Sequence, residues 1–220
     1  MYNRKDLLGL RDLSADEIMT ILNTAKEMKA KIDNPSLRDD SLSKSSIVTL
    51  FYENSTRTKM SFMLAGDYQG AIVKDLGVAT SSVSKGESLV DTGVTLDQMG
   101  INIMIIRHQM TGAAHLLAKN VKASVVNAGD GSNEHPTQAL LDLFTIMEKK
   151  GSFEGLKVVI LGDISHSRVA RSNAFGLTKL GAKVTLAGPS TLVSNSMKSL
   201  GVEVETDIPK AIKDADVVMG

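Results

Sequence analysis

Four consecutive residues, Ser55, Thr56, Arg57 and Thr58, carry side chains that bind phosphate. They follow an apolar run at 47–52 that is typical of a buried strand, and they precede apolar residues at 60–68 with helical spacing. A strand that turns into a helix exposes backbone N–H groups and the positive end of the helix dipole. A helix cap needs one hydroxyl, so three hydroxyls around an arginine, which can bind two oxygens of one anion, favour an anion site.

Two further groups stand where other predicted strands end. Arg107 and His108 follow an apolar run at 102–106. Arg107 is either solvated or directed into the ligand crevice, and a shared anion with Arg57 favours the second reading. His135 precedes a helix that begins with Pro136, and Gln138 lies one turn further on. His135 can donate to a carbonyl oxygen and Gln138 can accept from an amide N–H, although an ordinary helix start is an equal alternative.

Two loops add candidates of different strength. The polar loop at 81–87 contains Ser81 and Lys85; a solvated lysine is the commoner case, and a lid group that reaches a substrate anion is the alternative. Gly162 follows the predicted strand at 158–161, but a dinucleotide fingerprint would need two more glycines. Arg168 and Arg171 suggest carboxylate recognition, and a solvated helix residue is the alternative for Arg171.

Composition excludes several classes of protein. Lys and Arg number 25, as do Asp and Glu, so the net charge of zero argues against nucleic acid or an anionic membrane as a partner. The chain has no Cys, and its four His residues do not form a metal-binding spacing. No nucleophile–base pair is visible, so the residues favour direct transfer between two bound substrates, driven by orientation and electrostatic stabilisation.

The apolar pattern predicts an α/β fold with two doubly wound parallel-sheet domains. A first helix follows a capping box at Ser14 and Glu17. A short linker at 151–155 separates predicted domains at 1–150 and 151–220. The chain stops at the end of a predicted strand, so we expect the second domain to be incomplete. Strands are predicted at 46–52, 71–76, 102–106, 123–127, 156–161, 182–187, 202–205 and 216–219, and later helices at 56–69, 87–99, 111–119, 136–150, 166–180, 191–200 and 208–213.

Taken together, the motifs around Arg57, Arg107 and His135 resemble those of the transcarbamylases. The stretch 81–87 and the turn at 162–168 are similar to the aspartate branch, and the motifs occur in the family's order along essentially the whole chain. The resemblance implies a carbamoyl-phosphate domain followed by an aspartate domain. It assigns the phosphate to Ser55, Thr56, Arg57, Thr58 and Arg107, the carbamoyl oxygen to Thr58, Arg107 and His135, the carbamoyl NH₂ to Gln138, and an aspartate carboxylate to Arg168.

The same resemblance implies how the protein works and assembles. Carbamoyl phosphate and L-aspartate would be the substrates of a cytoplasmic step in pyrimidine biosynthesis, without metal or organic cofactor. Ser81 and Lys85 would serve the neighbouring subunit's site in a homotrimer, and regulatory chains are possible. Lys59 stands where the family usually has Arg, but it lies outside the phosphate motif, so we give this difference no weight. The family continues beyond Gly220, and we therefore expect weakened aspartate binding. A non-catalytic phosphate-binding and assembly fragment, or a transcarbamylase for another amino acid, remains an alternative.

Overall fold

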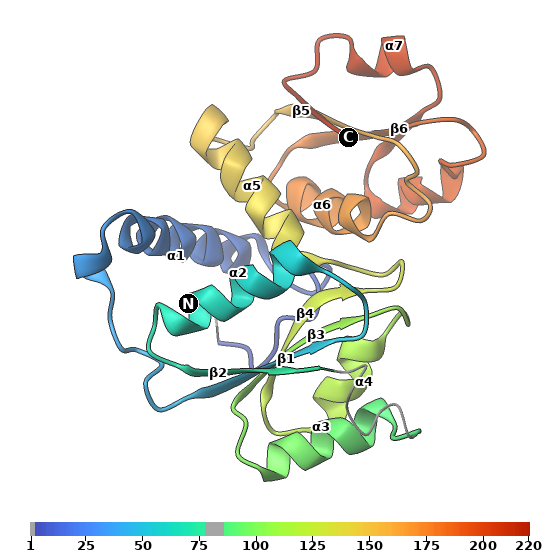
Figure 1. Ribbon diagram of the computed structural model, residues 1–220. Helices are drawn as coiled ribbons and strands as arrows, with labels where there is room; N and C mark the ends of the chain where they lie inside the picture. The colour runs from blue at the N-terminus through green and yellow to red at the C-terminus, as the bar shows by residue number, and fades with distance from the viewer. Residues whose placement is uncertain (1–2, 78–85) are drawn as a thin grey trace. The chain divides into compact units, whose positions relative to one another are not determined.

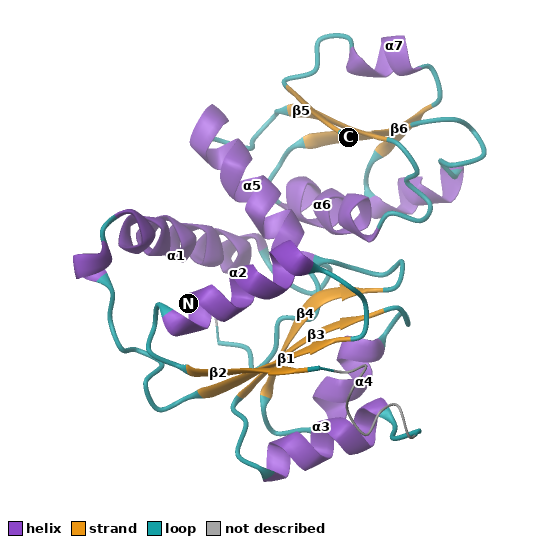
Figure 2. Cartoon of the chain, viewed as in Figure 1, coloured by secondary structure: helices purple, strands orange, loops and turns teal. Residues whose placement is uncertain are grey.

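The computed structural model describes residues 3–77 and 86–220, which form two compact units. The N-terminal unit comprises Asn3–Leu8 and Asn23–Asn133, and the C-terminal unit comprises Gly9–Leu22 and Glu134–Gly220. Each unit is an α/β structure in which strands and helices alternate (Figure 2). Among the described residues, none of the helices combines the length and the apolar character that a membrane crossing requires.

The N-terminal unit contains a parallel four-stranded sheet in the order β2-β1-β3-β4. Helix α2 covers one face, and α3 and α4 cover the other (Figure 1). From β1 the chain passes to the edge strand β2 and then returns to the opposite side of β1 as β3. The topological switch point, where ligands bind in such sheets, therefore lies between β1 and β3. The elements are β1 (Ser46–Phe51), α2 (Thr56–Asp67), β2 (Ile72–Leu76), α3 (Leu89–Gln98), β3 (Ile103–His108), α4 (Ala113–Asn120) and β4 (Ser124–Asp130).

The core of this unit forms on both faces of the sheet because its central strands are apolar at successive positions. Side chains of successive strand residues point to opposite faces. On the α2 face, Ile47, Phe51 and Ile105 are buried, with Phe62 packed against them. The opposite face buries a second cluster against α4, made of Val48, Leu50, Met104, Ile106, Ala113, Ala114, Leu117, Val121, Ala123 and Val125. This packing on both sides fixes the strand ends that carry the candidate residues.

The C-terminal unit contains a second parallel four-stranded sheet, in the order β7-β6-β5-β8. Helices α6 and α7 lie on opposite sides of it, and α5 packs against α6 (Figure 1). Its switch point lies between β5 and β8, since the chain returns to β5 after β7. The elements are α5 (Pro136–Lys150), β5 (Lys157–Leu161), α6 (Arg168–Lys179), β6 (Lys183–Ala187), the 3-10 helix η4 (Asn195–Leu200), β7 (Glu203–Glu205), α7 (Ile208–Ile212) and β8 (Val217–Met219).

Helix α1 (Ala15–Asp33) begins with the predicted capping box. The Ser14 N–H donates to Glu17 Oε2 at 2.8 Å, and the Glu17 N–H donates to Ser14 Oγ at 3.2 Å. The helix ends before Asn34, which caps the short 3-10 helix η1 (Pro35–Leu37). Both ends of this segment therefore follow from local side-chain signals.

The predicted fold class is confirmed, with corrections to individual elements. The predicted strand at 123–127 is too short, because β4 continues to Asp130. The predicted helix at 191–200 is wrong, because only η4 forms: the Ser194 hydroxyl accepts from the Ser196 N–H, and Gly201 ends the segment with φ +78°. The predicted strand at 102–106 is too short, because β3 continues through Arg107 and His108 and pairs again with β4 after an irregularity. The domain boundary after residue 150 stays a prediction; the compact units divide the chain after residue 133, since α5 packs on α6.

Candidate functional site

The first turn of α2 presents the predicted phosphate-binding residues. Ser55 is the N-cap residue in extended conformation, and its hydroxyl makes no capping hydrogen bond. Thr56 and Arg57 are exposed, whereas Thr58 is half-buried. Within residues 3–77 and 86–220, Arg57 forms no ion pair with a carboxylate. A helix N-terminus, hydroxyls and an exposed guanidinium therefore stand together after β1, and these are groups that can bind an anion.

Arg107 lies at the end of the neighbouring strand. In the β1–β3 register it stands opposite Phe51, and its carbonyl oxygen accepts from the Tyr52 N–H at 2.9 Å. Its Nε donates to Glu53 Oε2 at 3.0 Å, with the side chain 17% exposed. This contact orients the guanidinium through Nε and leaves the two terminal nitrogens for another acceptor. Glu53 was not among the predicted site residues, although it stands between the predicted strand and Ser55 in the sequence.

His108 has a structural setting that differs from that of Arg107. It is buried, and its Nδ1 accepts from the Met110 N–H at 2.9 Å. Its ring centroid lies 4.6 Å from that of Tyr52. Burial lowers the pKa of His108 below its usual value, against the opposing effect of Glu53 and Asp130. Arg107 is therefore a partly exposed cation, whereas His108 is a buried imidazole whose Nδ1 accepts a hydrogen bond.

Lys59 is held within the N-terminal unit. Its Nζ lies 2.9 Å from Asp75 Oδ2, and the Thr49 hydroxyl donates to the other carboxylate oxygen at 2.5 Å. Partial burial raises the pKa of Asp75, but the hydrogen bonds from Thr49 and Lys59 outweigh it and hold that pKa below the usual value. Lys59 thus has a carboxylate partner of its own.

In the C-terminal unit, His135 is the N-cap residue of α5, as predicted, and is only 6% exposed. Its backbone N–H donates to Ser172 Oγ of α6 at 2.9 Å. The ring atom Nδ1 lies 3.4 Å from the Thr137 hydroxyl. The imidazole is therefore positioned by the α5–α6 packing and by the conformation of its own helix terminus.

Glu134, which the sequence analysis did not single out, connects this region to the N-terminal segment. It is 2% exposed and accepts from the N–H groups of Leu10 at 2.7 Å and Arg11 at 3.3 Å. The Ser172 hydroxyl donates to it at 3.0 Å. Burial raises the pKa of Glu134, and the hydrogen bonds oppose this only in part. A Cβ on Gly9 would lie 2.3 Å from Glu134 Oε1, so only glycine fits there without displacing the carboxylate.

Gln138 belongs to a second network between α5 and α6. Its Nε2 donates to Asp142 Oδ1 at 3.0 Å, and Asn173 Nδ2 donates to Asp142 Oδ2 at 2.7 Å. Ser172 and Asn173 are consecutive on α6, so adjacent residues contact the two networks that surround His135 and Gln138. Neither partner was evident from the sequence, because both lie more than thirty positions from α5 residues that they contact.

The remaining predicted residues differ in where they lie. Arg168 is the first residue of α6, after the cap residue Ser167, and follows β5 at that unit's switch point. Arg171 is not simply solvated, since its Nε is buried and has no hydrogen-bond partner in the part of the chain that the structure describes. Ser81 and Lys85 lie outside the described residues.

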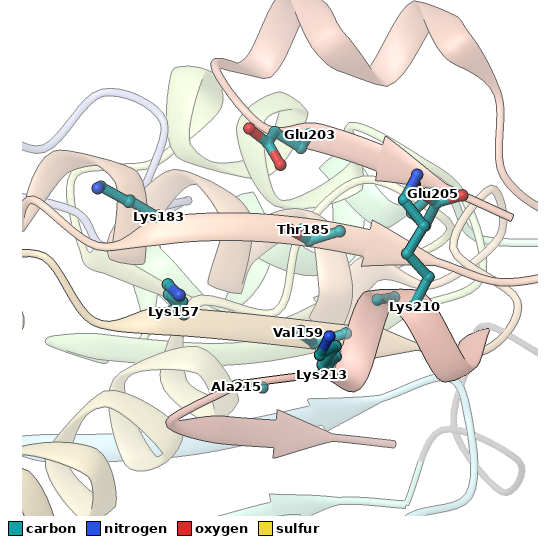
Figure 3. A pocket seen from close by; sticks show the side chains of 10 residues that line it. Lys157, Val159, Lys183, Thr185, Glu203, Glu205, Lys210, Lys213 and Ala215 are labelled. Carbon is teal, nitrogen blue, oxygen red and sulfur yellow. Dashed lines mark hydrogen bonds and ion pairs between the residues drawn. The ribbon is translucent and has the colours of Figure 1, made fainter. Parts of the chain in front are cut away.

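One cavity of about 340 Å³ lies on the α7 side of the second sheet (Figure 3). Alternate residues of three strands line it, which places them on one face, and Lys210 of α7 pairs with Glu205. None of the predicted site residues contributes to it. Its lining residues are Lys157, Val159, Lys183, Thr185, Glu203, Glu205, Lys210, Ala211, Lys213 and Ala215.

The chemistry of the two units is complementary. The N-terminal unit offers cationic and hydroxyl donors of the kind that bind a phosphate-sized anion, and the C-terminal unit offers the imidazole of His135, the amide of Gln138 and Arg168. Over the described ranges 3–77 and 86–220, no three His, Asp or Glu side chains are grouped so as to hold a metal ion. These are the types of residue that group transfer from an anionic donor requires.

Comparison with known proteins agrees with this class. Residues 5–148 match the family model for the aspartate/ornithine carbamoyltransferase, carbamoyl-P binding domain. The aspartate carbamoyltransferase catalytic subunit of Acetivibrio thermocellus is 62% identical over 216 residues, which are 98% of this chain and 69% of the relative. The corresponding subunit of Ruminiclostridium cellulolyticum is 61% identical with the same coverage.

Solved structures give the same result. Aspartate transcarbamoylase from Trypanosoma cruzi in complex with carbamoyl phosphate superposes with a TM-score of 0.87 at 30% identity, over 97% of this chain and 70% of that one. Its complex with aspartate and phosphate has the same TM-score and identity and is covered to 72%. The chain belongs to the aspartate/ornithine carbamoyltransferase family. Within it, the chain is a homologue of the aspartate carbamoyltransferase catalytic subunit.

Proposed function

We propose that this chain transfers the carbamoyl group of carbamoyl phosphate to the amine of L-aspartate, giving N-carbamoyl-L-aspartate and phosphate. The observation that carries the proposal is a pair of arginines at one switch point: Arg57 lies in the first turn of α2, which follows β1, and Arg107 lies near the end of the adjacent parallel strand β3. The reaction is a step of pyrimidine biosynthesis, which we place in the cytoplasm. Residues 1–150 would form the carbamoyl-phosphate domain and residues 151–220 part of the aspartate domain.

The residue roles follow from the chemistry of each group. Arg57, Arg107 and the helix N-terminus with its hydroxyls at residues 55, 56 and 58 bind the phosphate. Thr58, Arg107 and His135 donate to the carbamoyl oxygen. Gln138 accepts from the carbamoyl NH₂, and Arg168 binds a carboxylate of aspartate.

The transfer needs orientation and charge stabilisation. The aspartate amine attacks the carbamoyl carbon, a C–N bond forms, and the carbonyl oxygen becomes an oxyanion. Donors already in place around that oxygen stabilise the tetrahedral intermediate. The bond from the carbamoyl carbon to the phosphate oxygen then breaks, and phosphate leaves with the bonding electrons, stabilised by the arginines that bound it in the donor. The attacking nitrogen loses one proton, which the leaving phosphate takes up.

Two measurements on the chain test this function. Calorimetry should detect binding of carbamoyl phosphate, and of inorganic phosphate with lower affinity. An assay for carbamoyl-aspartate should detect turnover, which should be lost in His135→Ala. Absence of binding for both anions would contradict the assignment. Turnover with L-ornithine and none with L-aspartate would support a transcarbamylase for another amino acid.

We also propose a homotrimer in which Ser81 and Lys85 act in the neighbouring subunit's site. Mixing inactive Lys85→Ala trimers with inactive His135→Ala trimers should restore some activity after subunit exchange, because some hybrid sites would have both residues intact. Absence of any recovery despite demonstrated exchange would refute shared sites. Regulatory chains are a possible further partner of the trimer. Sedimentation of the trimer with and without such chains would detect their binding.

A second candidate function is binding of carbamoyl phosphate and trimer assembly without turnover. The family match favours it, because residues 5–148 match the carbamoyl-P binding domain. The chain spans 69% of the length of the first two catalytic subunits. Carbamoyl-phosphate binding in calorimetry together with no carbamoyl-aspartate at any aspartate concentration would establish this second function over the first.

A further inference from the structure

The amide of Gln138 is held in one of its two orientations by a carboxylate. Its Nε2 donates to Asp142 Oδ1, 3.0 Å away and one turn further along α5. Carboxylate oxygens accept hydrogen bonds and do not donate them, so the amide nitrogen has to face Asp142. The amide oxygen, on the other side of the same carbon, is thereby directed away from Asp142 as an acceptor.

Asp142 is in turn fixed from α6. Asn173, which is fully buried, donates from Nδ2 to Asp142 Oδ2 at 2.7 Å. Each carboxylate oxygen therefore has its own amide donor, and a rotation of Asp142 would break both contacts. The Oδ1 atom of Asn173 is buried without a partner among the described residues. The fold thus tolerates an unfavourable buried oxygen while it keeps the donor on Asp142.

We propose that Asp142, held by Asn173, is a specificity-determining positioning residue that makes Gln138 an acceptor for the NH₂ group of the carbamoyl donor. The inference rests on the proposed function and adds to it the residue that selects the donor. Acetyl phosphate is the informative probe, since it has the same phosphate and carbonyl but a methyl group in place of NH₂. A site with a fixed acceptor discriminates against an analogue that lacks the donor.

The test compares the affinities of carbamoyl phosphate and acetyl phosphate for the chain and for Asp142→Asn, by calorimetry. An amide at position 142 can donate as well as accept, so the Gln138 amide is free to rotate. We expect the preference for carbamoyl phosphate to fall about tenfold, chiefly through weaker carbamoyl-phosphate binding. Affinity for inorganic phosphate should not change. Glu148→Gln makes the same change of charge at an exposed position of α5 and should keep the preference.

A double-mutant cycle separates positioning from a general loss of structure. In a Gln138→Met background, Asp142→Asn should have no further effect on the preference, because there is no amide left to orient. Asp142→Ala removes the same contact if Asp142→Asn does not fold, as judged by thermal unfolding. An unchanged preference in folded Asp142 variants, or an equal change in the Gln138→Met background, overturns the inference alone. Failure of the unmodified chain to bind either acyl phosphate overturns the proposed function and this inference with it.

Discussion

The two units hold their candidate residues in opposite ways. In the N-terminal unit, Arg57 is exposed without an ion-pair partner among the described residues, and the capping hydroxyl of Ser55 is unused by its helix. In the C-terminal unit, His135 is buried, and the amide of Gln138 is bound to Asp142. Arg57 is thus an open, charged residue, whereas the side chains of His135 and Gln138 are restrained by their surroundings.

This difference follows from what each interaction requires. Charge attraction acts over several ångströms and tolerates a mobile side chain, so an exposed arginine can bind a phosphate without prior fixation. A neutral imidazole or amide contributes only in the correct orientation, which buried partners must maintain. Buried hydrogen-bond partners are therefore found around the groups whose orientation matters. Substitutions in the two units should accordingly differ in their effects on ligand affinity and on stability.

The largest difference is expected for Arg57→Ala. Removing a bidentate charge-assisted contact should lower the affinity for carbamoyl phosphate by roughly 2–4 kcal/mol, while the exposed position leaves the free energy of unfolding nearly unchanged. Calorimetry and urea unfolding measure the two quantities. Unchanged carbamoyl-phosphate or phosphate affinity would remove Arg57 from the anion site. A large loss of stability would remove the contrast between the units.

For Glu134→Ala in the C-terminal unit, we expect a loss of stability. The substitution leaves the Leu10 N–H without its acceptor and opens a cavity, so the free energy of unfolding should fall by about 2–3 kcal/mol. Glu134→Gln is the matched control, because it keeps the shape and one acceptor oxygen and should cost less. Equal stability of both variants and the unmodified chain in urea would show that the network around His135 is not restraining.

Acid should weaken the N-terminal unit through His108. Burial lowers the pKa of His108 in the folded state, so the unfolded chain binds the proton more tightly. The contribution of His108 to stability is full above about pH 6.5 and declines as the pH falls below that value. Glu134, whose pKa is raised, acts with the opposite sign: its effect is most favourable below its unfolded value and declines as the pH rises. Urea unfolding of the unmodified chain and of His108→Gln at pH 7.5 and 5.5 isolates the effect of His108. If both proteins lose the same free energy of unfolding on acidification, the proposed role of His108 is refuted.

The smallest effect is expected within the second sheet. Strand β8 is at the sheet edge, and Val218 is 53% exposed, whereas β5 is central and buried. We expect the amides of β8 and α7 to exchange with solvent faster than those of β5 and of β1 and β3, because edge strands open more easily. Residues 156–220 should accordingly be less protected as a group than residues 1–150. Equal protection in hydrogen-exchange measurements would contradict this expectation.

Prediction from sequence succeeded where the signal was local. The capping box at Ser14 and Glu17 and the helix start at Pro136 involve residues within one turn of each other, and both formed as predicted. The alternating strands and helices gave the fold class for the same reason, since apolar periodicity reports directly on burial. The assigned roles of Arg57, Arg107, Ser81 and Lys85 stay predictions.

What escaped prediction was non-local. Glu134 contacts Leu10 across 124 positions, and Asn173 contacts Asp142 across 31. No spacing rule connects such residues, because only the packing of α5 on α6 brings them together. The predicted helix at 191–200 failed for another reason: polar residues that hydrogen-bond their own backbone, such as Ser194, stabilise a tight turn as well as a helix.

Residues of the N-terminal segment contact partners that are synthesised at different times. Leu7 pairs with Val126 inside the N-terminal unit, whereas Leu10, three residues later, bonds Glu134, and Lys179 Nζ binds the carbonyl oxygens of Leu10, Arg11 and Leu13. As the ribosome extends the chain, the N-terminal unit has all its residues once position 133 has emerged. The N–H groups of Leu10 and Arg11 gain their acceptor when Glu134 follows, but the carbonyl oxygens of Leu10, Arg11 and Leu13 remain without Lys179 until α6 has been made. During that interval residues 9–13 of the nascent chain lack part of their final contacts in the C-terminal unit and are accessible to chaperones.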